Sequence, residues 1–448
     1  MKWRRYPKYK DSGIGWLGEV PEHWHVDRLK WTVRSCRNGI WGDEPNGDDD
    51  LLCIRVADFD RQRFSVSFDR MTLRSVTPAE RRNRLLSKGD LLLEKSGGGD
   101  LQPVGAVVSY DHSEPAVCSN FVAKMDIADD CDSRYQTYLH AHLYAGRVNT
   151  RSIKQTTGIQ NLDADAYLSE PVCYPGNEEQ HAIASFLDRE TARIDALIEK
   201  KQSQIELLQE KRAALISHAV TKGLDPNVKM KDSGIEWLGE VPEHWDMMRI
   251  KFVLRAIIDT EHKTAPFYPD GEYFVIRTSN VRDGRIVMKD ANYTNQDGYT
   301  EWTRRAIPTE GDIVFTREAP AGEACVLPRG LKVCLGQRTV LLRVRRDALV
   351  PEFAVYSIYC GIADAFIKTL SFGSTVNHFN MADIGSIPLL IPPLQEQIEI
   401  VKIVHRETNR VDSLIEKVMD SINKLSEYRT ALISAAVTGK IDVCEEAA

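Results

Sequence analysis

The chain has 448 residues, enough for two to four domains, and its 42% hydrophobic content is typical of a folded protein and argues against a disordered one. A net charge of −7 gives no electrostatic indication of a nucleic-acid partner. Nine cysteines without a Cys-x-x-Cys spacing argue against a disulfide framework or a zinc site. The lack of any run of 18 apolar residues argues against a membrane segment. We therefore expect a cytoplasmic protein.

The first element is a short box, residues 1–30, whose sequence returns later in the chain. Residues 10–30 match residues 231–251 at 16 of 21 positions, and both copies contain Trp-Leu-Gly-Glu-Val-Pro-Glu-His-Trp. Similarity this high indicates a unit that has been duplicated. The second copy follows directly after the first long helix, so pseudo-symmetry predicts that the first box packs near the end of the C-terminal helix.

The next element, residues 31–172, is predicted to be a strand-rich domain with a diverged copy at residues 252–388. Short β-branched runs bounded by Gly, Asp and Pro are typical of strands joined by turns. A few landmarks recur in the same order, although the sequences between them differ. They are Ile54-Arg55 and Ile276-Arg277, Gly89-Asp90 and Gly311-Asp312, Pro103 and Pro320, and Val117-Cys118 and Val333-Cys334. We therefore expect one α/β scaffold with two different surfaces.

Residues 173–223 and their counterpart within residues 389–448 are predicted to be long helices. Seam residues recur with alternating spacings of three and four, which is typical of a coiled coil. In the first helix they are Leu187, Thr191, Ile194, Ile198, Lys201, Ile205, Leu208, Arg212, Leu215 and Ala219. In the second helix they are Val404, Thr408, Val411, Ile415, Val418, Ile422, Leu425, Arg429, Leu432 and Ala436. Pro175 and Gly223 are typical residues for the two ends of the first helix.

We expect the two helices to pair with each other in an antiparallel coiled coil, because their seams are repeats within one chain. Packing of each helix on its own globular stretch, or pairing between chains, is the alternative. Polar seam residues recur at Thr191 and Thr408 and at Arg212 and Arg429, and such residues commonly set the register. With residues 224–251 as junction and second box, the sequence predicts an α/β (α+β) fold. Its two strand-rich domains are separated by the two long helices in a pseudo-twofold, effectively circular arrangement.

Several motifs together resemble one family. They are the two boxes, the junction Gly-Leu-Asp-Pro-Asn-Val-Lys-Met-Lys-Asp-Ser-Gly at residues 223–234, the Pro-Pro-Leu-Gln-Glu-Gln entry to the second helix at Pro392, and the Ala-Leu-Ile-Ser sequence near the end of each helix. The combination is similar to the specificity (S) subunit of Type I restriction-modification systems, over essentially the whole chain. The resemblance implies that each strand-rich domain is a target-recognition domain for one half of a bipartite site in double-stranded DNA. It also implies that the coiled coil fixes the spacing between the half-sites.

The resemblance further implies partner proteins. Two methyltransferase (M) subunits would dock on the conserved regions, bind S-adenosylmethionine and methylate adenine, and restriction (R) subunits would add translocation and cleavage that depend on ATP and Mg. The chain itself would be a non-catalytic subunit that binds no cofactor directly. The sequence agrees, because it has no Asn/Asp-Pro-Pro-Tyr/Phe motif. Its one Gly-Lys pair, Gly439-Lys440, is followed by Ile441 instead of the Ser or Thr of a phosphate-binding loop.

The residues predicted to contact DNA lie in loops that supply the side chains used for bases and phosphates. Arg and Lys suit guanine and phosphate, Asn and Gln suit adenine, and a glycine run lets backbone amides approach phosphate. In the first domain the predicted residues are Arg61, Arg63, Lys95, Ser96, Gly97, Lys154, Gln155, Gln160 and Asn161. In the second domain they are Arg282, Arg285, Arg317, Ser374, Thr375, Asn377 and His378. Each residue alone is a weak indication, because an exposed loop arginine is most often a solvated surface charge.

The candidate docking residues for the methyltransferase subunits are the box tryptophans Trp16, Trp24, Trp237 and Trp245. The alternative is that they clamp the recognition domain to the coiled coil. No catalytic residue or metal site is predicted, and His140 and His142 are expected to be packing residues on a helix. A competing function is that of a protein-only scaffold or inhibitor, which would use the same coiled coil without reading DNA.

Overall fold

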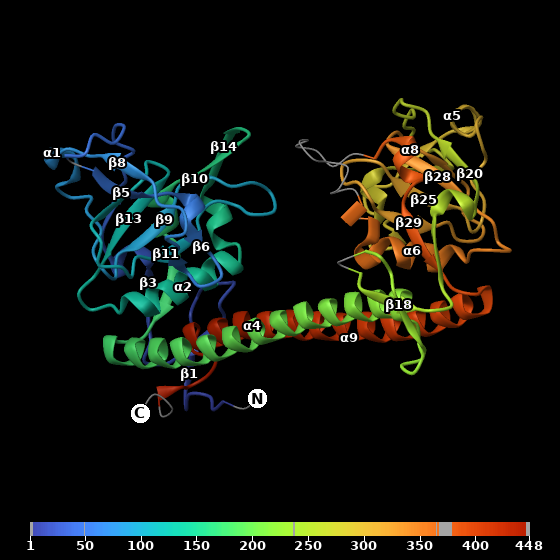
Figure 1. Ribbon diagram of the computed structural model, residues 1–448. Coiled ribbons are helices and arrows are strands. Elements are labelled where there is room, and N and C mark those ends of the chain that lie inside the picture. The colour runs from blue at the N-terminus through green and yellow to red at the C-terminus, as the bar shows by residue number, and fades with distance from the viewer. Residues whose placement is uncertain (1–2, 49, 236–237, 364, 367–378, 445–448) are drawn as a thin grey trace. The chain divides into compact units, whose positions relative to one another are not determined.

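The computed structural model describes residues 3–48, 50–235, 238–363, 365–366 and 379–444. The chain forms two compact units: unit 1 comprises residues 1–201 and 420–448, and unit 2 comprises residues 202–419. The N-terminal and C-terminal segments therefore belong to the same unit. Two long helices, α4 (Asn177–Lys222) and α9 (Leu394–Val437), each contribute residues to both units (Figure 1).

Unit 1 contains a six-stranded sheet in the order β4-β13-β9-β11-β7-β6 and a three-stranded sheet in the order β12-β5-β8. Neighbouring strands are antiparallel except for β7 with β11 and β5 with β12. The central strand β9 (Leu91–Glu94) is buried on both faces: Leu91 and Leu93 belong to one hydrophobic cluster and Leu92 to another, as the alternation of side chains along a strand requires. The sheet thus has a core on each side.

The remaining elements of unit 1 complete the two sheets, the box and the covering helices. The strands are β1 (Tyr9–Asp11), β2 (Glu19–Pro21), β3 (His25–Arg28), β4 (Val33–Asn38), β5 (Asp50–Ile54), β6 (Phe59–Asp60), β7 (Ser65–Val66), β8 (Leu73–Ser75), β10 (Ser96–Gly97), β11 (Val107–Ser109), β12 (Ala116–Cys118), β13 (Val122–Ile127), β14 (Ile153–Thr157), β15 (Ile159–Leu162) and β16 (Pro171–Tyr174). The shorter helices are α1 (Pro78–Arg81), α2 (Ser133–Ala145) and α3 (Ala164–Leu168).

Unit 2 repeats this plan with a sheet in the order β20-β28-β25-β26, a sheet in the order β24-β21-β27 and the hairpin β22-β23. Its strands are β17 (Met230–Asp232), β18 (Glu240–Pro242), β19 (Asp246–Arg249), β20 (Leu254–Asp259), β21 (Tyr273–Ile276), β22 (Val281–Arg282), β23 (Arg285–Ile286), β24 (Asn292–Thr294), β25 (Ile313–Thr316), β26 (Ala324–Val326), β27 (Val333–Leu335), β28 (Thr339–Val344) and β29 (Pro388–Ile391). Its shorter helices are α5 (Gln296–Trp302), α6 (Pro351–Ser357) and α8 (Met381–Ile384).

The central strands of the two units correspond. Strands β4, β13, β9 and β11 of unit 1 match β20, β28, β25 and β26 of unit 2, and the parallel pair β5–β12 matches the parallel pair β21–β27. Strand β25 is buried on both faces in the same way as β9, with Ile313 and Phe315 in one cluster and Val314 in another. This confirms the prediction of two strand-rich domains built on one scaffold.

In unit 1 the N-terminal box packs against the start of α4 and the end of α9. The Trp24 indole is buried and donates to Glu179 on α4 (3.0 Å), and the Tyr9 hydroxyl donates to the carbonyl of Gly439 just past α9 (3.0 Å). Gly439 has a φ of 68°, and a Cβ at this position would lie 2.3 Å from Pro21, so only glycine permits the approach. The N-terminal segment is therefore joined to the C-terminal one.

In unit 2 the second box makes the corresponding contacts with the other ends of the two helices. The buried Trp245 donates to Glu396 in the first turn of α9 (3.1 Å), and its ring lies beside Gly223 just past α4. His23 and His244 each contact the same glutamate as the neighbouring tryptophan, at 2.9 and 2.8 Å. Each box is thus fastened by a Trp, a His and one Glu.

The pairing of α4 with α9 is antiparallel, because the early part of α4 meets the late part of α9 in unit 1 and the reverse holds in unit 2. In unit 1 Asp195 accepts two hydrogen bonds from Arg429, at 2.9 and 3.2 Å. In unit 2 Asp412 accepts from Arg212 at 3.1 Å. Asp195 and Arg212 on α4 are the repeat equivalents of Asp412 and Arg429 on α9. The prediction of an antiparallel, pseudo-twofold helix pair is confirmed, and the recurring seam arginines have reciprocal partners.

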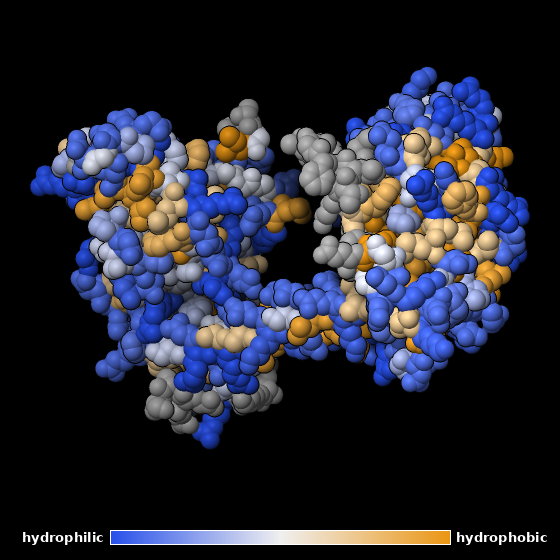
Figure 2. Space-filling model, in the orientation of Figure 1, coloured by the Kyte–Doolittle hydropathy of each residue, from blue (hydrophilic) through white to orange (hydrophobic). Residues whose placement is uncertain are grey.

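The surface drawn in Figure 2 is mostly hydrophilic, with hydrophobic residues gathered in patches on the strand-rich part of each unit. Among the described residues, no helix is both long and apolar enough to cross a membrane. No group of three or more His, Cys, Asp and Glu side chains in the same part of the chain is placed to hold a metal ion. His140 is fully buried on α2, where its Nδ1 lies 2.7 Å from the Tyr167 hydroxyl.

Candidate nucleic-acid interface

The structure brings two predicted DNA-contacting segments of unit 1 together in one small sheet. Strand β10 pairs with β15, and β15 pairs with β14, so that Ser96 lies opposite Asn161 and Gly97 opposite Gln160. Asn161 in turn lies opposite Lys154, and Gln160 opposite Gln155. Figure 1 shows the β14 end of this sheet at the side of unit 1 that faces away from α4 and α9. Residues from segments about sixty positions apart thus form one edge.

The side chains on this edge are a mixture of exposed polar groups and buried supports. Lys154 is largely exposed, and its Nζ lies 2.6 Å from Asp163; this hydrogen bond raises the pKa of Lys154 and lowers the pKa of Asp163. Asn161 is exposed and bonds to Ser96. Gln160 is buried, and its Oε1 accepts from the backbone N–H of Val104 (3.2 Å). Gln160 therefore supports the edge, whereas Lys154 and Asn161 remain accessible.

Lys95 and Arg317 occupy equivalent positions at the entry to the two candidate edges. In unit 1 the carbonyl of Lys95 accepts from the N–H of Leu162 (2.8 Å), and in unit 2 the carbonyl of Arg317 accepts from the N–H of Phe379 (3.0 Å). The Lys95 ammonium bonds to Asn38 at the end of β4, and Arg317 pairs with Asp259 at the end of β20 (3.3 Å). Ser374, Thr375, Asn377 and His378 lie outside the described residues.

The structure places the four predicted hairpin arginines differently from Lys95 and Lys154. Arg63 contacts Glu199 on α4, and Arg285 contacts Asp412 on α9. Arg61 pairs with the buried Glu94 at 2.8 Å; burial raises the pKa of the Glu94 carboxyl, and the ion pair opposes that shift. The fourth, Arg282, donates to the backbone carbonyls of Thr278 and Val281. Arg61, Arg63 and Arg285 thus contact other elements of their unit, whereas Arg282 bonds within its own segment. DNA contact by these residues stays a prediction.

The box tryptophans are not equally accessible. Trp24 and Trp245 are fully buried, so they can assist docking only by holding the box in place. Trp16 is half-buried, and its ring lies 5.8 Å from that of His142 on α2. Trp237 lies outside the described residues. The geometry of Trp24 and Trp245 favours the clamp interpretation for these two residues.

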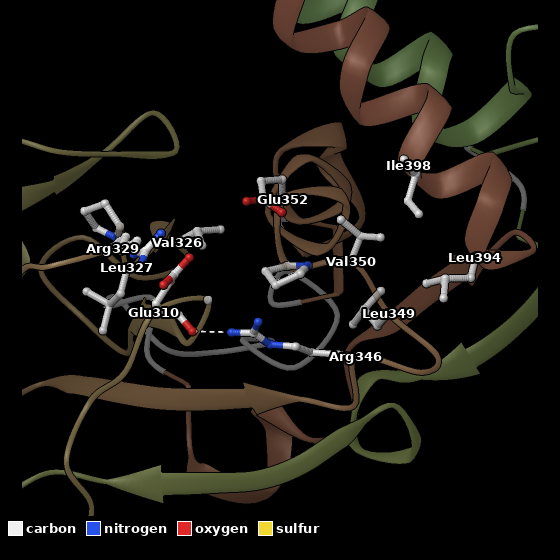
Figure 3. Close-up of a pocket in the computed structure, with 13 residues that line it drawn as sticks. Glu310, Val326, Leu327, Arg329, Arg346, Leu349, Val350, Glu352, Leu394 and Ile398 are labelled. Atoms are coloured by element: carbon white, nitrogen blue, oxygen red, sulfur yellow. Dashed lines mark hydrogen bonds between the residues drawn. The ribbon is translucent and has the colours of Figure 1, made fainter.

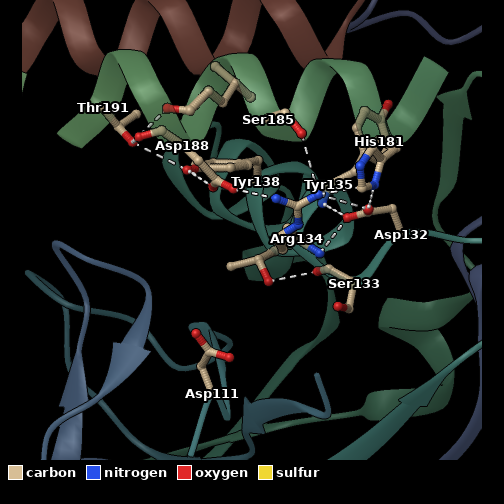
Figure 4. Close-up of polar contacts among 12 residues, drawn as sticks. Asp111, Asp132, Ser133, Arg134, Tyr135, Tyr138, His181, Ser185, Asp188 and Thr191 are labelled. Atoms are coloured by element: carbon tan, nitrogen blue, oxygen red, sulfur yellow. Dashed lines mark hydrogen bonds and ion pairs between the residues drawn. The ribbon is translucent and has the colours of Figure 1, made fainter. Parts of the chain in front are cut away.

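Helix α2 of unit 1 is joined to α4 by a polar network, shown in Figure 4. Arg134 contacts Asp188 at 2.8 Å and the ring of His181 at 3.1 Å, and His181 contacts Asp132 at 3.0 Å. The buried Gln180 accepts from the N–H of Asp132 (3.1 Å), which fixes the start of α2 against the start of α4. The joint is therefore closed by charged and polar side chains.

The equivalent joint of unit 2 contains an open cleft that is lined by both apolar and charged residues. Gln397 accepts from the N–H of Val350 (2.9 Å), as Gln180 does in unit 1, but a cleft of about 450 Å³ lies beside it. Leu394 and Ile398 point into this cleft from α9, and Ile398 is the repeat equivalent of His181 (Figure 3). The two units therefore share an anchor here and differ in the surface around it.

Comparison with known proteins agrees with the resemblance. The model of the Type I restriction modification DNA specificity domain matches residues 242–424, a region that begins within the second box and extends to the pairing region of α9. Over this region the chain is similar to the DNA specificity domain of Type I restriction-modification systems.

Curated specificity subunits are similar to this chain over most of its length. The putative type I restriction enzyme MjaX specificity subunit of Methanocaldococcus jannaschii is 21% identical over 95% of this chain and 96% of its own. The EcoKI specificity subunit of Escherichia coli K12 is 21% identical over 68% of this chain and 64% of its own. The HsdS subunit of Thermoanaerobacter tengcongensis has a similar fold, with a TM-score of 0.50 at 14% identity over 94% of this chain and 98% of its own. A chain from a structural study of complex assembly in the type I R-M system gives a TM-score of 0.69 at 15% identity over 93% and 98%.

One pair of exposed turns was missed by the sequence reasoning. The turn between β12 and β13 presents Asn120 and Phe121, and the equivalent turn between β27 and β28 presents Gln337 and Arg338. The landmarks Val117-Cys118 and Val333-Cys334 lie close to these turns, but in the structure Cys118 corresponds to Leu335, so the landmark alignment is shifted by one residue at the turn. The exposure of these turns depends on how the sheets pack, which could not be predicted from the sequence.

Proposed function

We propose that this chain is a specificity subunit in which each unit reads one half of a bipartite sequence in double-stranded DNA, and that α4 and α9 set the distance between the half-sites. The observation that carries the proposal is the repetition of one scaffold with two different edges. The strand order and the anchoring contacts agree between the units, whereas the exposed side chains do not. A shared scaffold with unlike edges is suited to two different ligands of one chemical class.

The side chains at the candidate edges have the chemistry that base reading requires. Lys154, Gln155 and Asn161 of unit 1 are exposed, and amide side chains recognise adenine while cations recognise guanine and phosphate. Arg317 and the segment with Ser374, Thr375, Asn377 and His378 would serve unit 2. We expect phosphate contacts to fix the orientation of the duplex and base contacts to supply the specificity.

The duplication also supports two copies of a partner. A pseudo-twofold chain offers two quasi-equivalent faces, so we propose that two methyltransferase subunits dock beside the boxes and the adjoining helix ends. These subunits would hold S-adenosylmethionine, and restriction subunits, where present, would bring the use of ATP and Mg. The buried Trp24 and Trp245 would act by fixing the boxes, and Trp16 and Trp237 are the tryptophans proposed to lie nearer the partner.

Exchange of a recognition domain tests the DNA-reading proposal. Residues 31–155 would be replaced by the corresponding segment of another specificity subunit, and the chimera would be expressed with the methyltransferase subunit of the same host. Long-read mapping of methylated adenines should show one half-site changed and the other retained. Methylation of the original sequence by the chimera would contradict the proposal and would favour a scaffold or inhibitor that does not read DNA.

A further inference from the structure

The missed turns occupy the same place in the two scaffolds and are held in the same way. The N–H of Ser119 donates to the carbonyl of Ile54 (2.9 Å), and the N–H of the equivalent Gly336 donates to that of Ile276 (2.8 Å). Each turn then continues into the strand beside the central one, β13 in unit 1 and β28 in unit 2. The two turns are therefore equivalent elements whose exposed residues can be compared position by position.

Both turns lie directly beside the entry to the candidate DNA-reading edge. The carbonyl of Phe121 accepts from the N–H of Lys95 (2.8 Å), and the carbonyl of Arg338 accepts from the N–H of Arg317 (2.9 Å). A second acceptor bond in unit 1 comes from the N–H of Ser96 (3.3 Å). Whatever contacts Lys95 or Arg317 is therefore within reach of the turn in the same unit.

The turns are rigid, although they are fixed by different means. In unit 1 the end of β4 passes so close that a Cβ on Gly39 would lie 2.1 Å from the carbonyl oxygen of Cys118. In unit 2 the equivalent residue is the buried Thr260, whose hydroxyl bonds to the carbonyls of Gly336 (3.1 Å) and Thr339 (2.8 Å). A rigid support of this kind is what a side chain needs if it is to discriminate between bases.

The side chains of the two turns, of which Gln337 is half-buried and the other three are exposed, differ in a way that matches base chemistry. Asn120 and Gln337 carry amides, which can bond to adenine N6 and N7. Phe121 is 54% exposed and offers an apolar face suited to the thymine methyl group, whereas the equivalent Arg338 offers a guanidinium suited to guanine O6 and N7. The exposed part of the Phe121 ring gains no stabilisation from burial in the free chain.

Arg338 has two features of a residue that is held for a ligand. Its φ of 70° is in the left-handed region, a conformation that costs free energy for a non-glycine residue and is concentrated at functional sites. Its Nε contacts Glu318 at 3.0 Å, which orients the guanidinium, and bidentate recognition of guanine can use the two Nη groups. Gln337, Arg338 and Arg277 also line a cleft of about 170 Å³ beside the turn. The arrangement combines an amide, cations and a concave surface.

We propose that these two turns are base-reading elements: Phe121 contacts a thymine methyl group in the half-site of unit 1, and Arg338 contacts a guanine in the half-site of unit 2. Asn120 and Gln337 contact an adenine next to each of these bases. The inference rests on the proposed reading of DNA by the two units and assigns a specific element to it. The different residues at equivalent positions of the two turns, Phe121 and Arg338, then account for part of the difference between the half-sites.

The test is a set of turn variants of the full chain, expressed with the methyltransferase subunit and mapped by long-read detection of methylated adenine. Arg338→Ala should reduce discrimination at one position of one half-site by about ten-fold or more, and Phe121→Ala should do so at one position of the other. Arg345→Ala is the matched control, since Arg345 is also an exposed arginine of unit 2 paired with a carboxylate, Asp347. It should leave both half-sites unchanged.

Two further arms decide the remaining outcomes. Arg338→Lys keeps the charge and loses the fork geometry, so a base-reading role predicts that discrimination stays low even if overall methylation recovers. Full discrimination in Arg338→Lys, or wild-type preference in both alanine variants, would overturn the inference. The exchange of residues 31–155 serves as the positive control: if it changes a half-site and the turn variants do not, only the turn inference fails. If the exchange also changes nothing, the proposed function itself fails.

Discussion

Trp24 fastens the N-terminal box to α4 through one hydrogen bond to Glu179, which also accepts from the Tyr6 hydroxyl at 2.7 Å. Replacement by Phe would keep part of the apolar contact, leave space at a fully buried position and leave the half-buried Glu179 carboxylate with one donor fewer. We expect Trp24→Phe to lower the free energy of unfolding by about 1–3 kcal/mol, the usual range for a hydrogen bond to a charged group. Urea unfolding followed by circular dichroism would measure the change.

The matched control for this prediction is Trp31→Phe, because the Trp31 side chain is 59% exposed. That substitution should stay within about 0.5 kcal/mol of the parent chain. Trp245→Phe should behave like Trp24→Phe, since Trp245 has the same relation to Glu396. Equal stability of the Trp24 and Trp31 variants would show that the indole bond does not fasten the box.

At the scale of residues, the repeat in the sequence pointed to the box tryptophans but did not reveal their hydrogen-bond partners. The duplication singled out Trp24 and Trp245, but their partners Glu179 and Glu396 lie about 150 positions away and carry no local signal. The same limit applies to Arg63: its loop predicted DNA contact, which stays a prediction, and nothing in the sequence indicated its ion pair with Glu199 on α4. A charged side chain in a loop is assigned by its tertiary neighbours, and one sequence does not contain them.

The antiparallel helix pair is registered by two reciprocal ion pairs, and they differ in burial. The Arg429 side chain is 9% exposed, makes two bonds to Asp195 and stacks at 5.0 Å over the ring of Phe64. Breaking a well-buried pair leaves an unpaired charge, so Arg429→Ala should cost about 3 kcal/mol of unfolding free energy. A double-mutant cycle with Asp195→Ala should give a coupling energy within about 0.5–3 kcal/mol.

A second cycle on the same helix provides the control. Lys424 and Asp420 form an exposed pair on α9, with side chains 71% and 62% exposed, and its coupling should be below about 0.5 kcal/mol. Thermal unfolding of the six variants and the parent chain would give both cycles. A coupling for Arg429 and Asp195 as small as that of the exposed pair would mean that the seam arginines do not fix the register.

At the scale of elements, helices were easier to predict than sheets because their signals are local. Heptad spacing and the prolines and glycines at the ends indicated α4 and α9, and α4 ends at Lys222, directly before Gly223. The sheet β10-β15-β14 could not be predicted as such, because it pairs Ser96 with Asn161 across 65 positions. The loops were recognised by composition, and only the fold showed that they meet.

At the scale of the whole molecule, the two repeats are joined by ion pairs between α4 of the first repeat and α9 of the second. Asp195 pairs with Arg429 and its repeat copy Asp412 pairs with Arg212, so each repeat supplies the acid to one pair and the base to the other. The boxes follow the same rule, with each one contacting the start of one helix and the end of the other. The contacts between the two repeats are therefore reciprocal. Identical subunits contact each other in the same way across a self-complementary interface.

The length of the helix pair α4 and α9 is predicted to set the gap between the two DNA half-sites, and this can be tested. Insertion of one heptad after Gln204 in α4 and one after Met419 in α9 leaves both ion pairs, Asp195 with Arg429 and Arg212 with Asp412, in their own units. Seven residues at about 1.5 Å each add about 10 Å, which corresponds to about three base pairs. Mapping of methylated adenines should then show a gap longer by about three base pairs between unchanged half-sites. Insertion in α4 alone should lower stability and methylation together, because it displaces Arg212 from Asp412. Methylation of the original gap by the doubly extended chain would mean that the helices do not set the spacing.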